Sequence, residues 1–381
     1  MRSELAQREI RDYSGELEEF NPIAIRAFKA QFDHFGGPLR RRDDGFRWYR
    51  LRYWDYVKKF RLNPLYTRYL ERFHFDFIKN HSLNAIASAQ DDVYLVGCFT
   101  GAYENITLFF TLMLSHPDVL PEIGDPTREK PWLKSLAQCR WCDPNSQLFR
   151  TLEVRDDPPA DFPVDPARRL FSHRLAIMAM DFLFFHEIGH LANGHLEFLS
   201  SDGNSTSLDE MTFSPYSRRT ALDYQALEFN ADTHAMFVMT QGWFRYPKLL
   251  PETMSFETVS EAVESLVLAM LSVFIMLDQT ASSVSAYDSA RHPHPAVRLA
   301  NVHNGTFELA DRQTPETHEE LRVAWARGFE RAQQMCSTLG VASSLWYAGE
   351  HEMDAVGEAY DRTAKRFQSI DRQLRPDLHR W

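Results

Sequence analysis

The sequence predicts an α+β protein that is mainly α-helical, with a small sheet in its N-terminal part. Three observations predict this fold class: several apolar stretches of helix length bounded by Pro, Asn or Gly, one short strand-like run before a Gly-containing turn, and no internal repeats. Of the 381 residues, 44% are hydrophobic and 13% aromatic, which allows a sizeable core and two or three structural units. This composition excludes a disordered chain, because disordered chains are poor in aromatic residues.

Charge and cysteine content indicate the compartment and the class of partner. The formal net charge of -11 argues against nucleic acid as a partner, because phosphate binding requires a basic surface. Four cysteines are too few for a disulfide scaffold, and the charged N-terminal segment does not resemble a signal peptide. The most apolar run, Leu266 to Leu277, is shorter than the roughly 20 residues that span a bilayer. We therefore expect a cytoplasmic protein without a membrane span, of undefined oligomeric state.

A basic and aromatic segment covers about residues 40–72, with 11 Lys or Arg against four acidic residues. Pro64 is expected to divide it into two helical pieces. The segment is typical of an amphipathic helical pair whose arginines neutralise an acidic body. The alternatives are binding of single-stranded nucleic acid through stacking and charge, and contact with a membrane surface.

Strands are expected at Val93–Phe99 and at about Gln147–Val154. The edge of a sheet containing either strand could pair with an extended substrate. A helix follows the first strand and is expected to end before Pro117. The stretch Asp156 to Pro166 is rich in Pro and Asp and marks a boundary.

Four helices are expected after this boundary. The longest covers about Ala167 to Asn193, with Pro166 suited to its first turn and Asn193-Gly194 to its end. The others are expected at about residues 220–241, at about residues 257–280, and from Pro293 or Pro295 onward, with a charged helical tail after about residue 315. The polar residues 200–219 are expected to form a long mobile loop that acts as a lid.

The strongest chemical signal is the motif His186-Glu187-Ile188-Gly189-His190 in the longest predicted helix. Residues i and i+4 share one face of a helix, so both imidazoles can bind one metal ion. Glu187, one step round the helix, is expected beside the open position of the metal, where it can take a proton from bound water. The alternative is a pair of core or surface histidines without a metal.

A second signal lies on the next predicted helix, where Glu228 and Asp232 are again spaced i and i+4. Catalytic zinc takes three protein ligands, and two His with one Glu is a known set, so Glu228 can supply the third. Asp232 is then placed to accept the second ring N–H of a ligand histidine. Small and apolar neighbours indicate that these acids are buried, and buried carboxylates need partners. The alternative is a solvated acidic face.

A third signal is the segment 291–303, where His292, His294 and Arg298 cluster around two prolines. An imidazolium or guanidinium near the metal could stabilise the oxyanion of a tetrahedral intermediate. A hydroxyl group from Tyr224 could do the same. The alternative is a structural helix start with exposed histidines.

Two weaker candidates remain. His195 follows Gly194 and is expected to interact with the helix dipole rather than with a metal. Cys139 and Cys142 have the spacing of zinc ligands but would need two more, so paired buried thiols are the preferred interpretation.

Together these segments resemble gluzincin peptidases of the HtpX and CAAX-prenyl-protease type, in which HExxH is followed by Glu-xxx-Asp and then by His-Pro and Arg. The resemblance covers about residues 168–303. It implies one zinc ion with ligands His186, His190 and Glu228, the base Glu187, the orienting residue Asp232, and His292 or Arg298 near the oxyanion or bracing the site. Members of that family are typically membrane-embedded, whereas no span is expected here. A looser likeness, through HExxH alone, connects the chain with phage-exclusion proteases of the Lit type.

The sequence therefore predicts a zinc metallopeptidase, an endopeptidase that hydrolyses an intracellular protein or peptide substrate with a Glu-activated, metal-bound water. Residues 1–160 are expected to form an N-terminal region of unknown role, residues 161–310 a gluzincin-like peptidase core and residues 311–381 a helical C-terminal segment. One alternative is a catalytically inactive, metal-stabilised binding or sensor protein on a peptidase fold. Another is a nucleic-acid sensor coupled to a peptidase.

Overall fold

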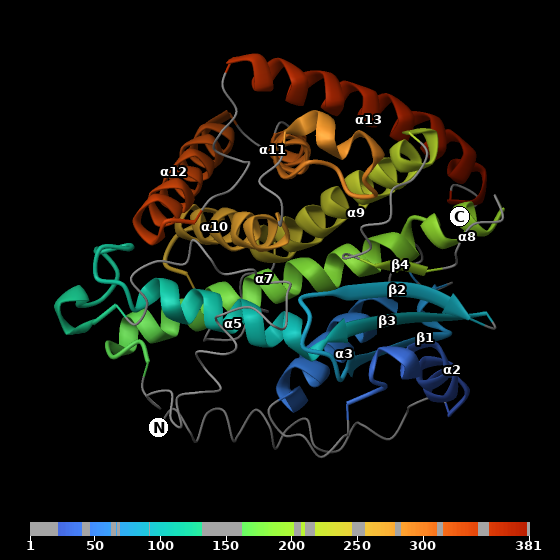
Figure 1. The fold of residues 1–381 in the computed structure, drawn as a ribbon, viewed down its shortest axis with the longest axis horizontal. Coiled ribbons are helices and arrows are strands. Elements are labelled where there is room, and N and C mark those ends of the chain that lie inside the picture. The colour runs from blue at the N-terminus through green and yellow to red at the C-terminus, as the bar shows by residue number, and fades with distance from the viewer. Residues whose placement is uncertain are drawn as a thin grey trace.

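The fold is seen in a computed structural model of the chain. It describes residues 22–39, 46–61, 66, 69–90, 92–131, 162–201, 207–209, 218–245, 256–278, 283–310, 315–341 and 350–378. Cys139, Cys142, Pro64 and the strand expected at 147–154 lie outside these ranges. The described residues form a mainly helical α+β fold, as the sequence predicts (Figure 1).

A small mixed sheet has the strand order β1-β3-β2-β4. The strands are β1 (Phe73–Ile78), β2 (Ala85–Gln90), β3 (Val93–Phe99) and β4 (Ser207–Asp209). Strand β3 runs parallel to β1 and antiparallel to β2, and β4 pairs antiparallel with β2. The predicted strand at 93–99 is therefore confirmed. It lies between two strands, so the edges of the sheet at which an extended substrate could pair are β1 and β4.

The sheet is covered on both faces because its side chains alternate. Leu95 and Ile86 pack with the helix α2 (Pro22–Phe32) in one apolar cluster. Phe75 and Val96 point into the main core, which also contains residues of α3 (Arg47–Arg61), α5 (Thr100–Leu114) and α7 (Pro166–Ala192). Figure 1 shows the sheet between α2 and α7.

Helix α7 is the predicted long helix, and it begins and ends as expected. The Asp165 side chain accepts hydrogen bonds from the backbone N–H groups of Ala167 and Arg168, and Pro166 occupies the first turn. Asn193 is the C-cap, and Gly194 follows with φ of 74°, a conformation that glycine adopts without strain. The start of the helix is thus set by its cap and its end by a glycine.

Arg168 ties the first turn of α7 to the segment that follows α5. Its side chain is fully buried, and its guanidinium donates hydrogen bonds of 2.7–2.9 Å to five backbone carbonyls. The acceptors are Leu114, His116, Val119, Leu120 and Ile123. Carbonyls that the end of α5 and the following turns leave without helical partners are satisfied in this way.

A layer of helices lies on the other side of α7, away from the sheet (Figure 1). It contains α9 (Arg218–Arg245), α10 (Val259–Leu277), α11 (Pro295–Ala310), α12 (Pro315–Leu339) and α13 (Glu350–Leu378). The remaining elements are α8 (His195–Ser201) and the 3-10 helices η2 (Asp33–Phe35), η4 (Pro126–Arg128) and η7 (Val284–Ser289). The predicted helices are confirmed within a few residues. The single long loop expected at 200–219 is wrong, since this stretch contains the end of α8, strand β4 and the start of α9.

The basic and aromatic segment contributes α3, which turns its aromatic residues into the core. Tyr49 and Tyr53 are buried, with 2% and 1% exposure. Arg50 pairs with Asp76 at 2.6 Å, and the Arg52 Nε donates to Asp181 at 3.0 Å. These contacts support the interpretation as an amphipathic helix whose arginines neutralise acidic groups of the body.

Two helices, α7 and α10, are long and apolar enough to cross a membrane by length and composition alone. Their apolar windows are 100% and 83% buried inside the protein. The buried core helices of globular proteins have the same length and composition.

Candidate metal centre

Two imidazoles and one carboxylate converge where α7 faces α9. His186 and His190 come from α7 and Glu228 from α9, and their ligand atoms all lie within 4.8 Å of one another. The two Nε2 atoms are 3.0 Å apart. Glu228 places Oε2 3.1 Å from Nε2 of His186 and Oε1 3.6 Å from Nε2 of His190. The i, i+4 spacing on α7 and the carboxylate on α9 thus meet at one point, as the sequence predicts.

Gly189 allows the two helices to come this close. A Cβ built on Gly189 would lie 3.1 Å from the Cα of Ala231 and 3.0 Å from the Cβ of His234, both on α9. These distances are shorter than ordinary carbon–carbon contacts. The glycine between the two ligand histidines therefore sets the spacing between α7 and α9.

The ring of His186 is held by Asp232, one turn after Glu228. The His186 Nδ1 lies 2.9 Å from Oδ1 of Asp232, whose carboxylate also accepts two hydrogen bonds from Arg298, at 2.7 and 2.8 Å. Burial by itself raises the pKa of Asp232, but the charge and hydrogen bonds of Arg298 and His186 outweigh it and keep the pKa below its usual value. Asp232 is thus an anion that accepts the Nδ1–H of His186, which leaves Nε2 of that ring facing Glu228.

The ring of His190 is held differently, by another histidine. Its Nδ1 lies 2.8 Å from Nδ1 of His195, and Nε2 of His195 lies 2.9 Å from Oδ1 of Asn230 on α9. Burial lowers the pKa of His195 to about 3, so its ring is neutral at physiological pH. From the sequence, His195 is expected to interact with the helix dipole, and no pattern indicates Asn230. Instead His195 begins α8 and contacts a ligand histidine.

Glu187, the acid within the motif on α7, is buried, with 1% exposure. Burial and the charge of Glu187 together raise the pKa of the Cys98 thiol on strand β3 well above its usual value. The thiol is therefore protonated at neutral pH, and Glu187 is close enough to β3 to act on it.

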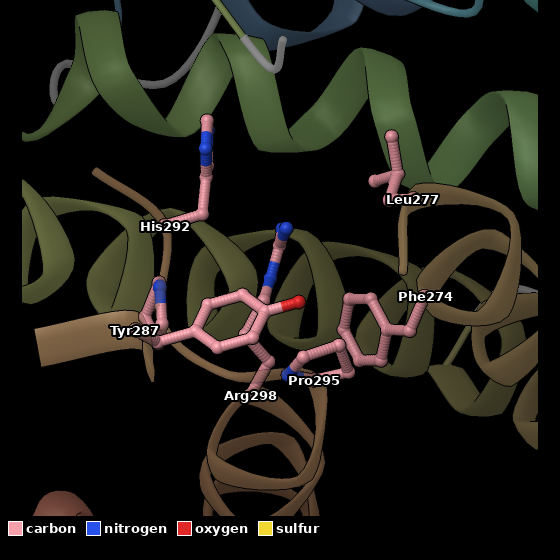
Figure 2. Close-up of a pocket in the computed structure, with 7 residues that line it drawn as sticks. Phe274, Leu277, Tyr287, His292, Pro295 and Arg298 are labelled. Carbon is pink, nitrogen blue, oxygen red and sulfur yellow. The ribbon is translucent and has the colours of Figure 1, made fainter. Parts of the chain in front are cut away.

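A small cavity of about 20 Å³ lies beside the centre, lined by residues of α10, η7 and the start of α11. It can hold about one water molecule. In Figure 2, His292 points toward α7, whereas the hydroxyl of Tyr287 points toward Phe274. The Nε2 of His292 is 3.7 Å from Oε2 of Glu228, so this imidazole reaches the edge of the ligand group.

The other candidates from the sequence have structural contacts. Arg298 lines the cavity but directs its guanidinium to Asp232. The Nδ1 of His294 accepts the backbone N–H of Ala296 in the first turn of α11. Tyr224 is buried one turn before Glu228, with the Arg291 guanidinium 4.8 Å from its ring centre. The structure therefore brings His292, and not His294, next to the ligand group.

The chemistry of this donor set fits a divalent metal ion such as zinc. Ligands at the zinc–nitrogen distance of about 2.05 Å in a tetrahedron are separated by about 3.3 Å, and the three separations measured here are 3.0, 3.1 and 3.6 Å. Both rings have their Nδ1 atoms engaged elsewhere, so both direct Nε2 to the same point. Three protein ligands leave a fourth position open, as in catalytic zinc sites.

Comparison with known proteins agrees with this centre. The model of the family Peptidase U49 matches residues 156–319, a segment that contains every candidate ligand and its supports. Searches of curated proteins and of solved structures give no match. The chain is thus similar to peptidases of family U49 across this segment, and its buried cluster of His186, His190 and Glu228 could hold a metal ion.

Proposed function

We propose that the protein is a zinc-dependent endopeptidase that cleaves an intracellular protein in the cytoplasm. The observation that carries the proposal is the convergence of His186, His190 and Glu228, with Glu187 adjacent in the same motif. The similarity of residues 156–319 to Peptidase U49 supports a peptidase. Two imidazoles with one carboxylate favour zinc over the hard cations that prefer oxygen ligands.

The roles of the residues follow from their positions. When bound, the ion supplies Lewis-acid polarisation of a peptide carbonyl and makes a water molecule more acidic. The carboxylate of Glu187 takes the proton from the attacking water and delivers it to the leaving amine. Because Glu187 is buried, its proton transfers are shielded from bulk solvent.

His292 is the residue that we propose for the oxyanion. Its ring lies at the edge of the ligand group and beside the small cavity, where a polarised carbonyl oxygen could accept its N–H. We propose that Arg298 holds Asp232 in place and does not touch a substrate. Its guanidinium already donates two hydrogen bonds to that carboxylate on the side that faces the centre.

A second candidate function is an inactive, metal-stabilised binding protein. The burial of the centre favours it, since the side chains of all three candidate ligands are at most 2% exposed. A closed structural site has four protein ligands, and His292 is near enough to be considered as the fourth. X-ray absorption of the metal-loaded protein separates the two functions. Three imidazoles bound to the metal favour the structural site, and two bound imidazoles favour the catalytic site with an open position.

The test of the proposed activity is the substitution Glu187→Gln. It keeps the shape of the side chain but removes the base, so we expect one zinc per chain and at least about a 100-fold loss of cleavage. Elemental analysis gives the metal content. Mapping of new protein N-termini in cells that carry either form identifies the cleaved protein, and the purified forms are then compared on it. Glu319→Gln, in an exposed pair with Arg322 on α12, is the control and should cleave normally.

Cleavage by Glu187→Gln at the rate of the unsubstituted enzyme would exclude Glu187 as the base. Purified protein that contains no metal and takes none up would exclude the metallopeptidase itself. Zinc retained in both forms with no new N-termini in either would favour the binding protein.

A further inference from the structure

The two candidate histidine ligands are supported by groups of different charge. His186 contacts the carboxylate of Asp232, which is itself paired with Arg298. The Nδ1 of His190 faces another imidazole, that of His195, at 2.8 Å. A neutral ring can either donate or accept at a given nitrogen, so something further must determine which of the two rings donates.

The amide of Asn230 makes that choice. Its carbonyl oxygen lies 2.9 Å from Nε2 of His195, and an oxygen can only accept. His195 is fully buried, and its two ring nitrogens face an imidazole and an amide, neither of which is an anion, so a second ring proton would be a buried charge without a counterion. The single ring proton must therefore lie on Nε2, which leaves Nδ1 as an acceptor. The facing Nδ1 of His190 must then carry its own proton, and Nε2 of His190 is left bare.

We propose that His195 and Asn230 form a relay that positions His190 and fixes its tautomer, so that Nε2 is ready to bind a metal. The inference rests on the proposed function in one respect, namely that His190 is a metal ligand. Neither residue touches the ligand point, so both are positioning residues. The opposite orientation of the Asn230 amide would reverse every hydrogen bond in the relay and place a proton on Nε2 of His190, where it would block the metal.

The relay also connects helices α7, α8 and α9 through hydrogen bonds. His195 begins α8, immediately after the glycine that ends α7, and Asn230 lies between Glu228 and Asp232 on α9. A single helix, α9, thus supplies the third ligand and one support for each of the two histidines. His195 is fully buried, so water does not compete for its hydrogen bonds.

Nuclear magnetic resonance of metal-free protein labelled with 15N-histidine tests the tautomers directly. Long-range proton–nitrogen correlations distinguish a bare ring nitrogen from a protonated one. We expect His195 to be protonated on Nε2 alone and His190 on Nδ1 alone. A proton on Nε2 of His190 in place of Nδ1 would overturn the proposal, whether or not the protein binds zinc.

Zinc affinity, measured by competition with a coloured chelator, tests what the relay does. His195→Leu and Asn230→Leu should weaken binding by about 10- to 100-fold, the usual effect of losing such a support. His195→Asn should restore it, because its amide oxygen branches at the position of Nδ1 and can accept from His190. Asn230→Asp should also bind well, since a carboxylate only accepts. His303→Leu, at a half-buried histidine of α11 whose ring packs against Trp325, is the control.

The outcomes separate the relay from the proposed function. Equal affinities for His195→Leu and His195→Asn would overturn the relay while leaving a zinc site in place. Absence of zinc binding in the unsubstituted protein would overturn the proposed function, and the tautomer of His190 would then decide the relay alone. If His195→Leu fails to fold, the comparison of Asn230→Leu with Asn230→Asp makes the same distinction.

Discussion

The substitution Gly189→Ala tests how closely the centre depends on the distance between α7 and α9. An alanine Cβ at this position would lie 3.0 Å from the Cβ of His234 and 3.1 Å from the Cα of Ala231. Neither atom is the free end of a flexible side chain, so the contact can be relieved only by moving one helix. Carbon atoms in contact are normally about 3.5–4.0 Å apart, so α9 must move away by about 0.5 Å.

This movement should affect the metal more than the fold. Alanine favours a helix over glycine by about 1 kcal/mol, and the overpacking costs about 1–3 kcal/mol, so the free energy of unfolding should fall by at most about 2 kcal/mol. Metal sites tolerate ligand displacements of only about 0.2 Å. Since Glu228 moves with α9, we expect zinc affinity to fall by at least about 10-fold, as it does when a supporting residue is lost.

The assay is zinc competition combined with urea unfolding of the metal-free protein. Gly357→Ala on α13 is the matched control, because a Cβ there meets nothing within 4 Å. It should raise the free energy of unfolding by about 1 kcal/mol and leave zinc affinity unchanged. If Gly189→Ala binds zinc as tightly as the unsubstituted protein, the spacing argument is refuted.

Three further predictions follow from contacts around the same elements. Arg298→Ala removes both hydrogen bonds to Asp232, so zinc affinity should fall by about 10- to 100-fold; a lower kcat with unchanged affinity would instead indicate an oxyanion role. Arg168→Met removes a donor shared by five backbone carbonyls, three of them in fully buried hydrogen bonds, and should lower the free energy of unfolding by about 3 kcal/mol or more; an unchanged urea midpoint would contradict this. Removing zinc with a chelator should lower the melting temperature, because zinc at about 1,000 times its Kd stabilises the fold by about 4 kcal/mol; equal melting curves would exclude a site that forms only in the folded protein.

Most of what could be predicted about the metal centre came from the spacing of residues within single helices. The i, i+4 pairs on α7 and α9 each define one helix face, so HEIGH and Glu228 with Asp232 could be recognised without knowing how the helices pack. That the two faces meet also followed from chemistry, since a pair of imidazoles needs a third ligand to hold zinc. The close approach at Gly189 is a property of the packing, and no local pattern reveals it.

The supports of the ligands were predicted only in part, because their partners are distant in sequence. His195 is 35 residues from Asn230, and Arg298 is 66 residues from Asp232. A histidine next to a helix end is explained equally well by the helix dipole, which is why its contact with His190 was missed. Asn230 could have been noticed from its place between the two acids of α9, but an isolated asparagine in a helix has no characteristic spacing.

Strands β1 and β2 were not predicted, although β1 carries a local strand signal. Its residues Phe73, Phe75 and Phe77 alternate with His74 and Asp76, which is the period-2 pattern of a strand. In the structure, the ring of His74 packs against Phe28 at 5.1 Å, and Asp76 pairs with Arg50. These polar residues are compatible with a buried sheet only because tertiary contacts satisfy them.

From Leu175 onward, helix α7 has no exposed position at which sequence variation is free. Every residue from Leu175 to Ala192 is buried, so each side chain next to the motif is also a packing element of the core. A change that tuned metal affinity or substrate choice from within this helix would disturb the sheet on one side or the helical layer on the other. Adaptation of the centre to a new substrate is therefore expected to arise around His292, on the segment between η7 and α11 that borders the cavity.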